Sequence, residues 1–300
     1  MSLSLSPPII DDSQPANVMH RENTRYSISC HHGDVSQPNN LEQAKKVYHN
    51  KGYEIDIYEV DFVCFCGRIV SAHDYDRQQI SSGSSLEEWI DFFVVQKRKI
   101  LWLDIKENIT LVSGGCGYEK FDYRALFDVL EAKRQEVMRR FIDDGGDVDE
   151  LFIDNSKSVT GLYPPLDIAN YIVIGCQDAE LHKKIANKSR QHKKRWRLIL
   201  DSPDVWAYVL QYLCPGFLAP YLCDYVCEQF RQTKYRHYGM ISIDQSFFSS
   251  RSKLIDFIKS LKLSPNTMVI VNSYDRTVPP LQIENHYIVM QYDYASEDFL

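Results

Sequence analysis

The stretch ILWLDIK, residues 100–106, is an apolar run that ends in a polar Asp-Ile-Lys sequence. An earlier run of similar character, residues 54–62, carries Glu59 and Asp61 near its end. Successive side chains of a β-strand point to opposite faces, so polar residues two positions apart project to the same side. The two runs therefore predict strands that each present a pair of polar groups on one face.

Short β-rich runs of this kind alternate with amphipathic stretches along the whole chain after residue 25. Such alternation is typical of helices that cross over between parallel strands. The expected strands are residues 26–31, 54–62, 100–106, 171–177, 196–201, 239–244, 268–272 and 287–291. The expected helices include residues 41–50, 85–96, 121–142, 178–189 and 250–261. This pattern predicts an α/β protein with a (β/α)8 TIM-barrel fold.

An open doubly wound sheet is the alternative architecture, but it usually has a glycine-rich phosphate turn after its first strand. Here the first strand ends in His31-His32-Gly33, which favours the barrel. We expect residues 1–25 to form a flexible N-terminal segment and residues 26–300 a single barrel domain. The connection of about residues 107–169 is longer than a simple crossover, and we interpret it as an elaborated loop.

Composition narrows the class of protein further. The chain has 300 residues, of which 25% are charged and 44% hydrophobic, and a formal net charge of −7. These values exclude a disordered chain, a collagen and a small disulfide scaffold, and without a basic excess nucleic acid is not an expected partner. The N-terminus lacks the features of a signal peptide, so we expect a cytoplasmic protein whose eight cysteines are reduced thiols.

Two segments of the chain are relevant to contact with a membrane. The longest apolar stretch, residues 205–230, is interrupted by Pro215, Gly216 and Pro220, so we predict no transmembrane helix. Its aromatic residues fit either core packing or a lipid-facing loop. The basic segment 182–195 fits a solvated helix face, or peripheral contact with an anionic lipid surface if it lies at the same end as the aromatic stretch.

The polar residues of the predicted strands suggest a metal site. In a barrel enzyme the catalytic groups lie at the carboxyl ends of the strands. Glu59, Asp61 and Asp104 are expected to face inward and converge there. Three neighbouring carboxylates repel one another, so the cluster requires a cation or protonation. Ligands that are all carboxylates favour a hard ion, Mg²⁺ or Ca²⁺, over zinc.

Two histidines complete the expected constellation. His31 falls on the face of the first strand that is directed into the barrel mouth, and residues 67–74 predict a turn and a short return strand that ends near His73. Two imidazoles that flank a metal can serve as general base and general acid at neutral pH. Lys106 would neutralise an oxygen of a phosphate group.

The order of these motifs resembles the glycerophosphodiester phosphodiesterase family and its relatives in the phospholipase-C-like barrel superfamily, including the sphingomyelinase-D-type phospholipases. The family's His-Arg-Gly is similar to His31-His32-Gly33, and its Asn-Thr-Leu helix start to residues 39–41. Its Glu-x-Asp pair matches residues 59–61, its His-Asp matches residues 73–74, and its Glu-Ile-Lys is similar to residues 104–106. Later in the chain, residues 269–272 and 290–293 lie where the family has Trp-Thr-Val-Asn and Thr-Asp-Tyr-Pro.

The resemblance implies a metal-dependent phosphodiesterase that cleaves a glycerophosphodiester or a (lyso)phospholipid-like substrate, by hydrolysis or through a cyclic phosphate. In that scheme His31 and His73 are the acid–base pair, and one divalent cation is held by the three carboxylates Glu59, Asp61 and Asp104. His32 replaces the family's arginine, and we expect it to contact the substrate phosphate together with Lys106.

Two alternative functions are set against this one. The loss of the arginine motivates a catalytically inactive barrel that binds a phospholipid head group or a protein partner. A barrel metal hydrolase acting on amides is disfavoured, because such sites need His-x-His on the first strand and further histidines on later strands. Here His31 and His32 are adjacent instead.

Overall fold

The structure of the chain is a computed structural model. It describes residues 27–31, 41–51, 55–65, 67–72, 77–106, 121–146, 167–176, 179–191, 196–200, 240–245, 248–263, 267–273, 281–283 and 286–293.

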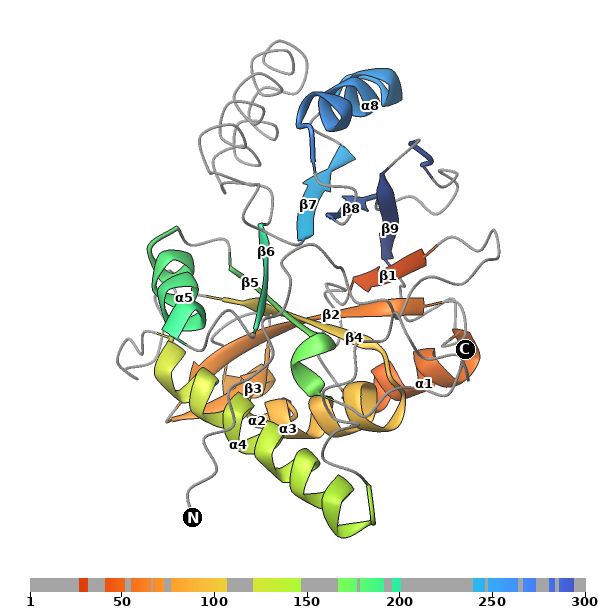
Figure 1. The fold of residues 1–300 in the computed structure, drawn as a ribbon. Coiled ribbons are helices and arrows are strands. Elements are labelled where there is room, and N and C mark those ends of the chain that lie inside the picture. The colour runs from red at the N-terminus through yellow and green to blue at the C-terminus, as the bar shows by residue number, and fades with distance from the viewer. Residues whose placement is uncertain are drawn as a thin grey trace.

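The strands form one sheet that closes on itself (Figure 1). The strands are β1 (Ser27–His31), β2 (Ile55–Phe65), β3 (Arg68–Ser71), β4 (Ile100–Ile105), β5 (Ile172–Cys176), β6 (Arg197–Leu200), β7 (Met240–Asp244), β8 (Met268–Asn272) and β9 (Tyr287–Asp293). Their order is β1-β9-β8-β7-β6-β5-β4-β2-β3, and a further pairing of β1 with β2 closes the ring.

Every pairing in the closed ring is parallel, whereas β3 pairs with β2 in antiparallel orientation. The ring therefore consists of eight parallel strands, and the predicted (β/α)8 barrel is confirmed. Strand β3 lies outside this ring, and it is the return strand expected after the second strand. The turn that precedes it contains Gly67 at φ 73°, a backbone conformation that glycine adopts without strain.

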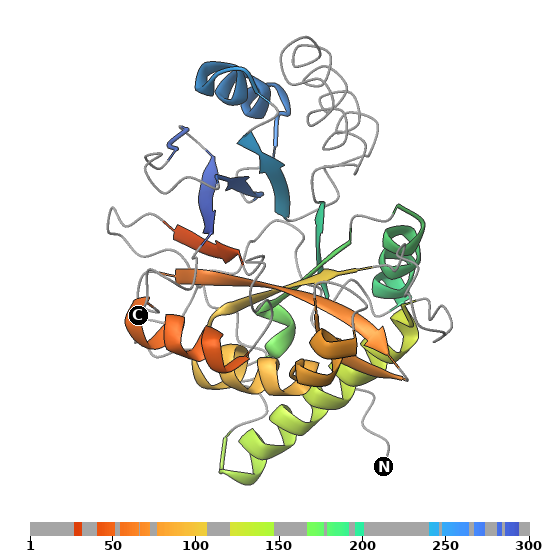
Figure 2. The ribbon, with the colours of Figure 1, turned by 180° about the vertical axis from the view of Figure 1, so that it is seen from behind.

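The helices lie on the outside of this ring. The described helical elements are α1 (Leu41–Lys51), α2 (Arg77–Ser82), α3 (Leu86–Trp89), η2 (Ile90–Gln96), α4 (Tyr123–Asp143), η5 (Ile168–Asn170), α5 (Ala179–Gln191) and α8 (Arg251–Ser260). Figures 1 and 2 show α1, α3 and α4 together on the outer side of β2 and β4. Helix α4 lies within the elaborated loop, where Asp122 caps it by accepting hydrogen bonds from the N–H groups of Arg124 and Ala125.

The segment 85–96 differs from the single α-helix that its pattern predicts. The α-helix α3, capped by Ser85, changes at Ile90 into the π-helix η2. Phe92, Phe93 and Val94 are consecutive and all buried. A regular α-turn would spread them over more than half of the helix surface, and the wider π-turn accommodates them against the core.

The inside of the barrel is divided into an apolar layer and a polar layer. The apolar layer contains Ile57, Ile100, Trp102, Val173, Ile199, Met240, Met268, Ile270 and Val289. Two positions further along their strands, on the same face, lie Glu59, Asp104, Gly175, Ser242, Asn272 and Gln291. The packed lower part of the barrel thus supports a ring of mostly polar residues toward the carboxyl ends of the strands.

Gly175 is the exception in that ring, and its lack of a side chain has a packing reason. A Cβ at this position would lie 2.7 Å from Trp102 Nε1 and 2.7 Å from Ile199 Cγ2. Both neighbours are fixed in the barrel interior, so Gly175→Ala is expected to destabilise the protein by about 1–3 kcal/mol through overpacking. Urea denaturation measures this change, and Gly67→Ala, in a turn open around its Cα, provides a comparison for backbone strain without overpacking.

His182 on α5 makes the stability of the fold dependent on pH. Burial lowers the pKa of its imidazole, although a hydrogen bond with the backbone of Ile199 acts in the opposite direction. The unfolded chain therefore binds a proton more readily than the folded chain, and stability should decrease as the pH falls below about 6.5. Denaturation at several pH values checks this, and His182→Asn should reduce the slope between pH 7.5 and 5.5.

Among the described residues, each helix is too short or too polar to cross a membrane.

Candidate active site

Three carboxylates converge where β2 and β4 pair, toward the carboxyl end of their parallel ladder. Glu59 and Asp61 lie on β2 and Asp104 on β4, where Asp61 and Asp104 are direct partners in the strand ladder. One oxygen of each carboxylate lies within 4.8 Å of the others. Their residues are only 2–4% exposed. The alternation of side chains along a strand explains the arrangement, because Glu59 and Asp61 share a face and register aligns Asp104 with them.

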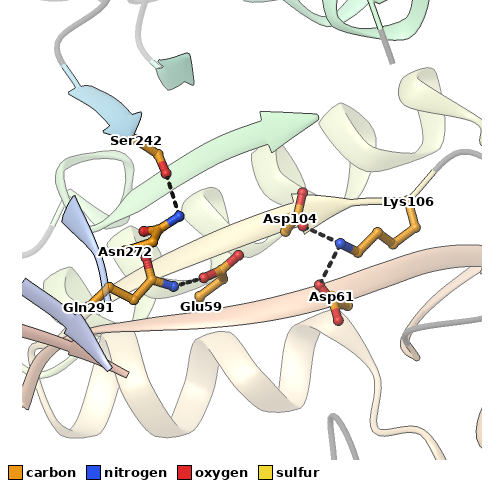
Figure 3. A network of polar contacts seen from close by, with 7 residues as sticks. All are labelled: Glu59, Asp61, Asp104, Lys106, Ser242, Asn272 and Gln291. Carbon is orange, nitrogen blue, oxygen red and sulfur yellow. Dashed lines mark hydrogen bonds and ion pairs between the residues drawn. The ribbon is translucent and has the colours of Figure 1, made fainter. Parts of the chain in front are cut away.

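Lys106 follows β4 and supplies positive charge to this cluster. Its ammonium lies 2.5 Å from Asp104 Oδ2 and 3.1 Å from Asp61 Oδ1 (Figure 3). Burial by itself lowers the pKa of the ammonium, but the charges of the three carboxylates, Asp104 foremost, and the hydrogen bond to Asp104 hold that pKa well above its usual range. Lys106 is therefore protonated, and it offsets one of three potential negative charges.

The opposite side of the site is formed by side-chain amides from the last strands. Gln291 on β9 donates a hydrogen bond from Nε2 to Glu59 Oε2. Asn272 on β8 donates from Nδ2 to Ser242 Oγ at 3.1 Å, and it is the ladder partner of Gln291. Figure 3 shows these residues beside Glu59, away from the Lys106 side of the cluster. Closure of the barrel places Gln291 next to a carboxylate 232 positions earlier in the chain.

The strand patterns predicted that Glu59, Asp61, Asp104 and Lys106 lie close together. The structure places all four in contact or within a few ångströms of each other. The strand pattern did not identify Gln291, Asn272 or the buried Ser242 as site residues. A signal for them was present in the sequence, because each follows an inward-facing apolar position by two residues in a predicted strand.

The predicted histidines are placed only in part. His31 is the last residue of β1 and the ladder partner of Asp293. Ser29, two residues earlier, pairs with Gln291, so His31 occupies the same alternating series of ladder positions. His32 and His73 lie outside the described residues, as do residues 1–25 and the aromatic stretch 205–230.

The residues present fit a hard divalent cation. All donor atoms of the triad are carboxylate oxygens, which suit Mg²⁺ and Ca²⁺ and disfavour zinc. Two of these carboxylates at about 4.8 Å repel by about 3.5 kcal/mol at an effective dielectric constant near 20. Lys106 offsets part of this repulsion through its contacts with the two aspartates, and a divalent cation would offset more of it.

The fold is similar to those of other solved structures. A glycerophosphodiester phosphodiesterase from Agrobacterium tumefaciens is similar, with 11% identity and a TM-score of 0.46, over 89% of this chain and 95% of that chain. A glycerophosphodiester phosphodiesterase from Parabacteroides distasonis has 9% identity and a TM-score of 0.44, over 92% of this chain and 96% of that chain. No family model and no curated protein matches the sequence.

Proposed function

We propose that the protein is a metal-dependent phosphoric diester hydrolase that cleaves a glycerophosphodiester or a (lyso)phospholipid-like substrate. The observation that carries the proposal is the buried triad of Glu59, Asp61 and Asp104 at the mouth of a parallel barrel, with the ammonium of Lys106 bridging the two aspartates. Carboxylates arranged in this way at the carboxyl ends of barrel strands are suited to hold a cation beside a phosphate group.

The triad would hold one Mg²⁺ or Ca²⁺, which supplies charge compensation for the oxygens of a bound phosphodiester. Gln291 orients the Glu59 carboxylate by donating to it. Lys106 is fixed by Asp61 and Asp104, so its charge stays beside the site while substrate binds. This arrangement lets an anionic phosphate approach a cluster that would otherwise repel it.

His31 and His73 are the proposed acid–base pair. One imidazole would take the proton of the attacking hydroxyl and the other would give a proton to the leaving alkoxide. Attack by water yields a monoester, whereas attack by a hydroxyl of the substrate yields a cyclic phosphate. The position of His31 at the carboxyl end of β1, in the ladder series that contains the partner of Gln291, supports this role. His32 is proposed to contact the phosphate.

A second candidate is a catalytically inactive barrel that binds a phospholipid head group or a protein partner. The observation that favours it is the position of Lys106, whose ammonium already contacts two of the three carboxylates. In such a protein the ammonium of Lys106 would permanently supply part of the positive charge that a bound cation supplies in the enzyme.

Phosphorus NMR separates the two functions. Glycerophosphodiesters and lysophospholipids are incubated with the purified protein and Mg²⁺, Ca²⁺ or a chelator. The enzyme should convert at least one substrate to a monoester or cyclic phosphate only when the divalent cation is present. Unchanged spectra with every cation, for a protein that binds the cation, would favour the inactive barrel.

His31→Ala and His73→Ala are each expected to lower kcat by about 10²–10⁴-fold, because each removes one proton-transfer group. The activity assay is accompanied by a thermal melt, which should change little for either variant. His49→Ala, in an exposed histidine of α1, is the matched control and should retain full activity. Full activity in both the His31 and His73 variants would contradict the acid–base assignment.

A further inference from the structure

Two arginines at the amino-terminal end of the barrel lack a counter-ion. Arg98 lies two residues before β4, and Arg197 is the first residue of β6. Both residues are partly buried, yet neither forms an ion pair with a described residue. Arg98 Nη1 is buried without a hydrogen-bond partner among the described residues. On helix α4, by contrast, the buried Arg134 contacts the carboxylate of Asp167 at 2.7 Å.

The two guanidinium groups flank Tyr171, which directly precedes the intervening strand β5. The backbone carbonyl of Tyr171 accepts a hydrogen bond from Leu101 N–H on β4 at 2.8 Å, and on the other side Val173 is the ladder partner of Arg197. Burial lowers the pKa of Arg98, and it lowers the pKa of Arg197 to about 10, while the phenol of Tyr171 opposes both shifts. A phenol that acts on both groups lies near both, and at neutral pH both arginines remain charged.

Arg98 also has a backbone conformation that arginine does not favour. Its φ is 56°, in the left-handed region, and it follows Lys97, the C-cap residue of η2. Glycine or asparagine usually occupies this position, because a Cβ is strained there. A basic side chain after a helix can donate to the last carbonyls, but Arg98 Nη1 makes no such bond among the described residues. A strained cation without a partner indicates a role outside the packing of the fold.

The charge and shape of the two groups select an anion. Arg197 shares a face of β6 with Ile199, which belongs to the apolar layer inside the barrel. Two like charges that are partly withdrawn from water are unfavourable unless an anion compensates them. A guanidinium is a planar fork of N–H donors that matches the oxygens of a phosphate. Two such forks, with two positive charges, suit a phosphate dianion better than a carboxylate, which has one negative charge.

We infer that Arg98 and Arg197 form a binding site for a phosphate dianion, either inorganic phosphate or the phosphate group of a monoester, at the end of the barrel opposite to the carboxylate triad. Arg98 precedes Asp104 by six residues, which corresponds to about 20 Å of extended chain. The apolar layer that contains Trp102 and Ile199 lies between the two sites. The phosphate site is therefore separate from the triad and does not depend on the proposed function.

Isothermal titration calorimetry with sodium phosphate tests this on the full chain, in Tris buffer and after removal of divalent cations. Without a cation the carboxylate triad repels phosphate, so binding reports on the arginines. The wild-type protein is expected to bind one phosphate with a Kd of about 1 mM or tighter, and acetate at least about tenfold more weakly. Glycerol phosphate is titrated in parallel. Tighter binding of glycerol phosphate than of phosphate would identify a monoester as the ligand, and equal or weaker binding would identify inorganic phosphate.

Two variants remove the guanidinium groups one at a time. Arg98→Gly also relieves the backbone strain at φ 56°, so it should fold at least as well as the wild type. Arg197→Met keeps an unbranched side chain without the charge. Each is expected to weaken phosphate binding at least about tenfold. The matched control is Lys262→Gly, because Lys262 is a cation at φ 49° directly after α8, at the same end of the barrel, but is exposed. It should leave the phosphate affinity unchanged.

Thermal melts provide a second readout and show whether each variant is folded. Phosphate at about ten times its Kd should raise the Tm of the wild type and of Lys262→Gly, but not that of either arginine variant. Absence of phosphate binding by the wild-type protein would overturn the inference, as would equal affinity for acetate or an unchanged phosphate affinity in either arginine variant. If Arg197→Met folds poorly, Arg98→Gly decides alone, since glycine suits the backbone at this position.

Discussion

Glu59→Gln is expected to lower kcat/KM by at least about 10³-fold while leaving the metal-free protein no less stable than the wild type. The activity falls because one of three carboxylates that hold the cation becomes a neutral amide, and charge stabilisation by a metal contributes several kcal/mol. The stability is kept because the substitution relieves repulsion from Asp61 and Asp104, within 4.8 Å. The new amide can still accept a hydrogen bond from Gln291.

Thermal melts with and without CaCl₂, combined with the NMR activity assay, check both halves of this prediction. The wild-type protein should be stabilised by the cation and Glu59→Gln should not, because a ligand stabilises only a fold that binds it. Asp56→Asn is the control, since Asp56 lies at the other end of the same strand and faces Lys99 at 3.8 Å. A Glu59→Gln protein that keeps full activity with the cation, or that without the cation is much less stable than the wild type, would contradict the assignment.

The two effects expected for Glu59→Gln, a lower activity and an unreduced stability, both depend on how the sequence places the three carboxylates together. The Glu-x-Asp spacing on one strand and the Asp-x-Lys spacing on another were sufficient to predict a shared inner face, because strand alternation is a local property. The parallel barrel then followed from the alternation of strands and helices. Local patterns thus predicted the carboxylates, the lysine and the fold that gathers them.

The contacts of the Asn272 and Gln291 amides depend on information that local patterns lack. Gln291 reaches Glu59 only because β1 pairs with both β2 and β9 and so closes the ring. The exact partner of an amide is set by this closure and by side-chain rotamers, neither of which a strand pattern specifies. The π-helix at 90–96 is similar: the need to bury Phe92 and Phe93 together is a tertiary requirement that overrides the regular helical period.

Lys106→Met is expected to destabilise the metal-free protein by about 3–5 kcal/mol, because it leaves the buried carboxylates of Asp61 and Asp104 without the cation that contacts both. Saturating CaCl₂ should restore much of this loss, since a concentration of about 100 times Kd contributes about 2.7 kcal/mol. Activity should remain low in the presence of CaCl₂, because the ion compensates the aspartates but does not replace the ammonium beside the phosphate. Urea denaturation with and without CaCl₂ measures the stability change.

Lys99→Met is the matched control for this prediction. Lys99 lies 3.8 Å from Asp56, whose side chain is 28% exposed, so its loss should cost only about 0–1 kcal/mol and should not respond specifically to CaCl₂. The comparison also tests whether the site accepts a cation beside Lys106. If Lys106 permanently takes the place of a cation, CaCl₂ will stabilise Lys106→Met but not the wild type; if Lys106 and the cation act together, CaCl₂ will stabilise both. Stabilisation of the wild-type protein is the result that the enzyme requires, because its mechanism uses both charges on one phosphate, and turnover in the NMR assay then separates the enzyme from a barrel that only binds.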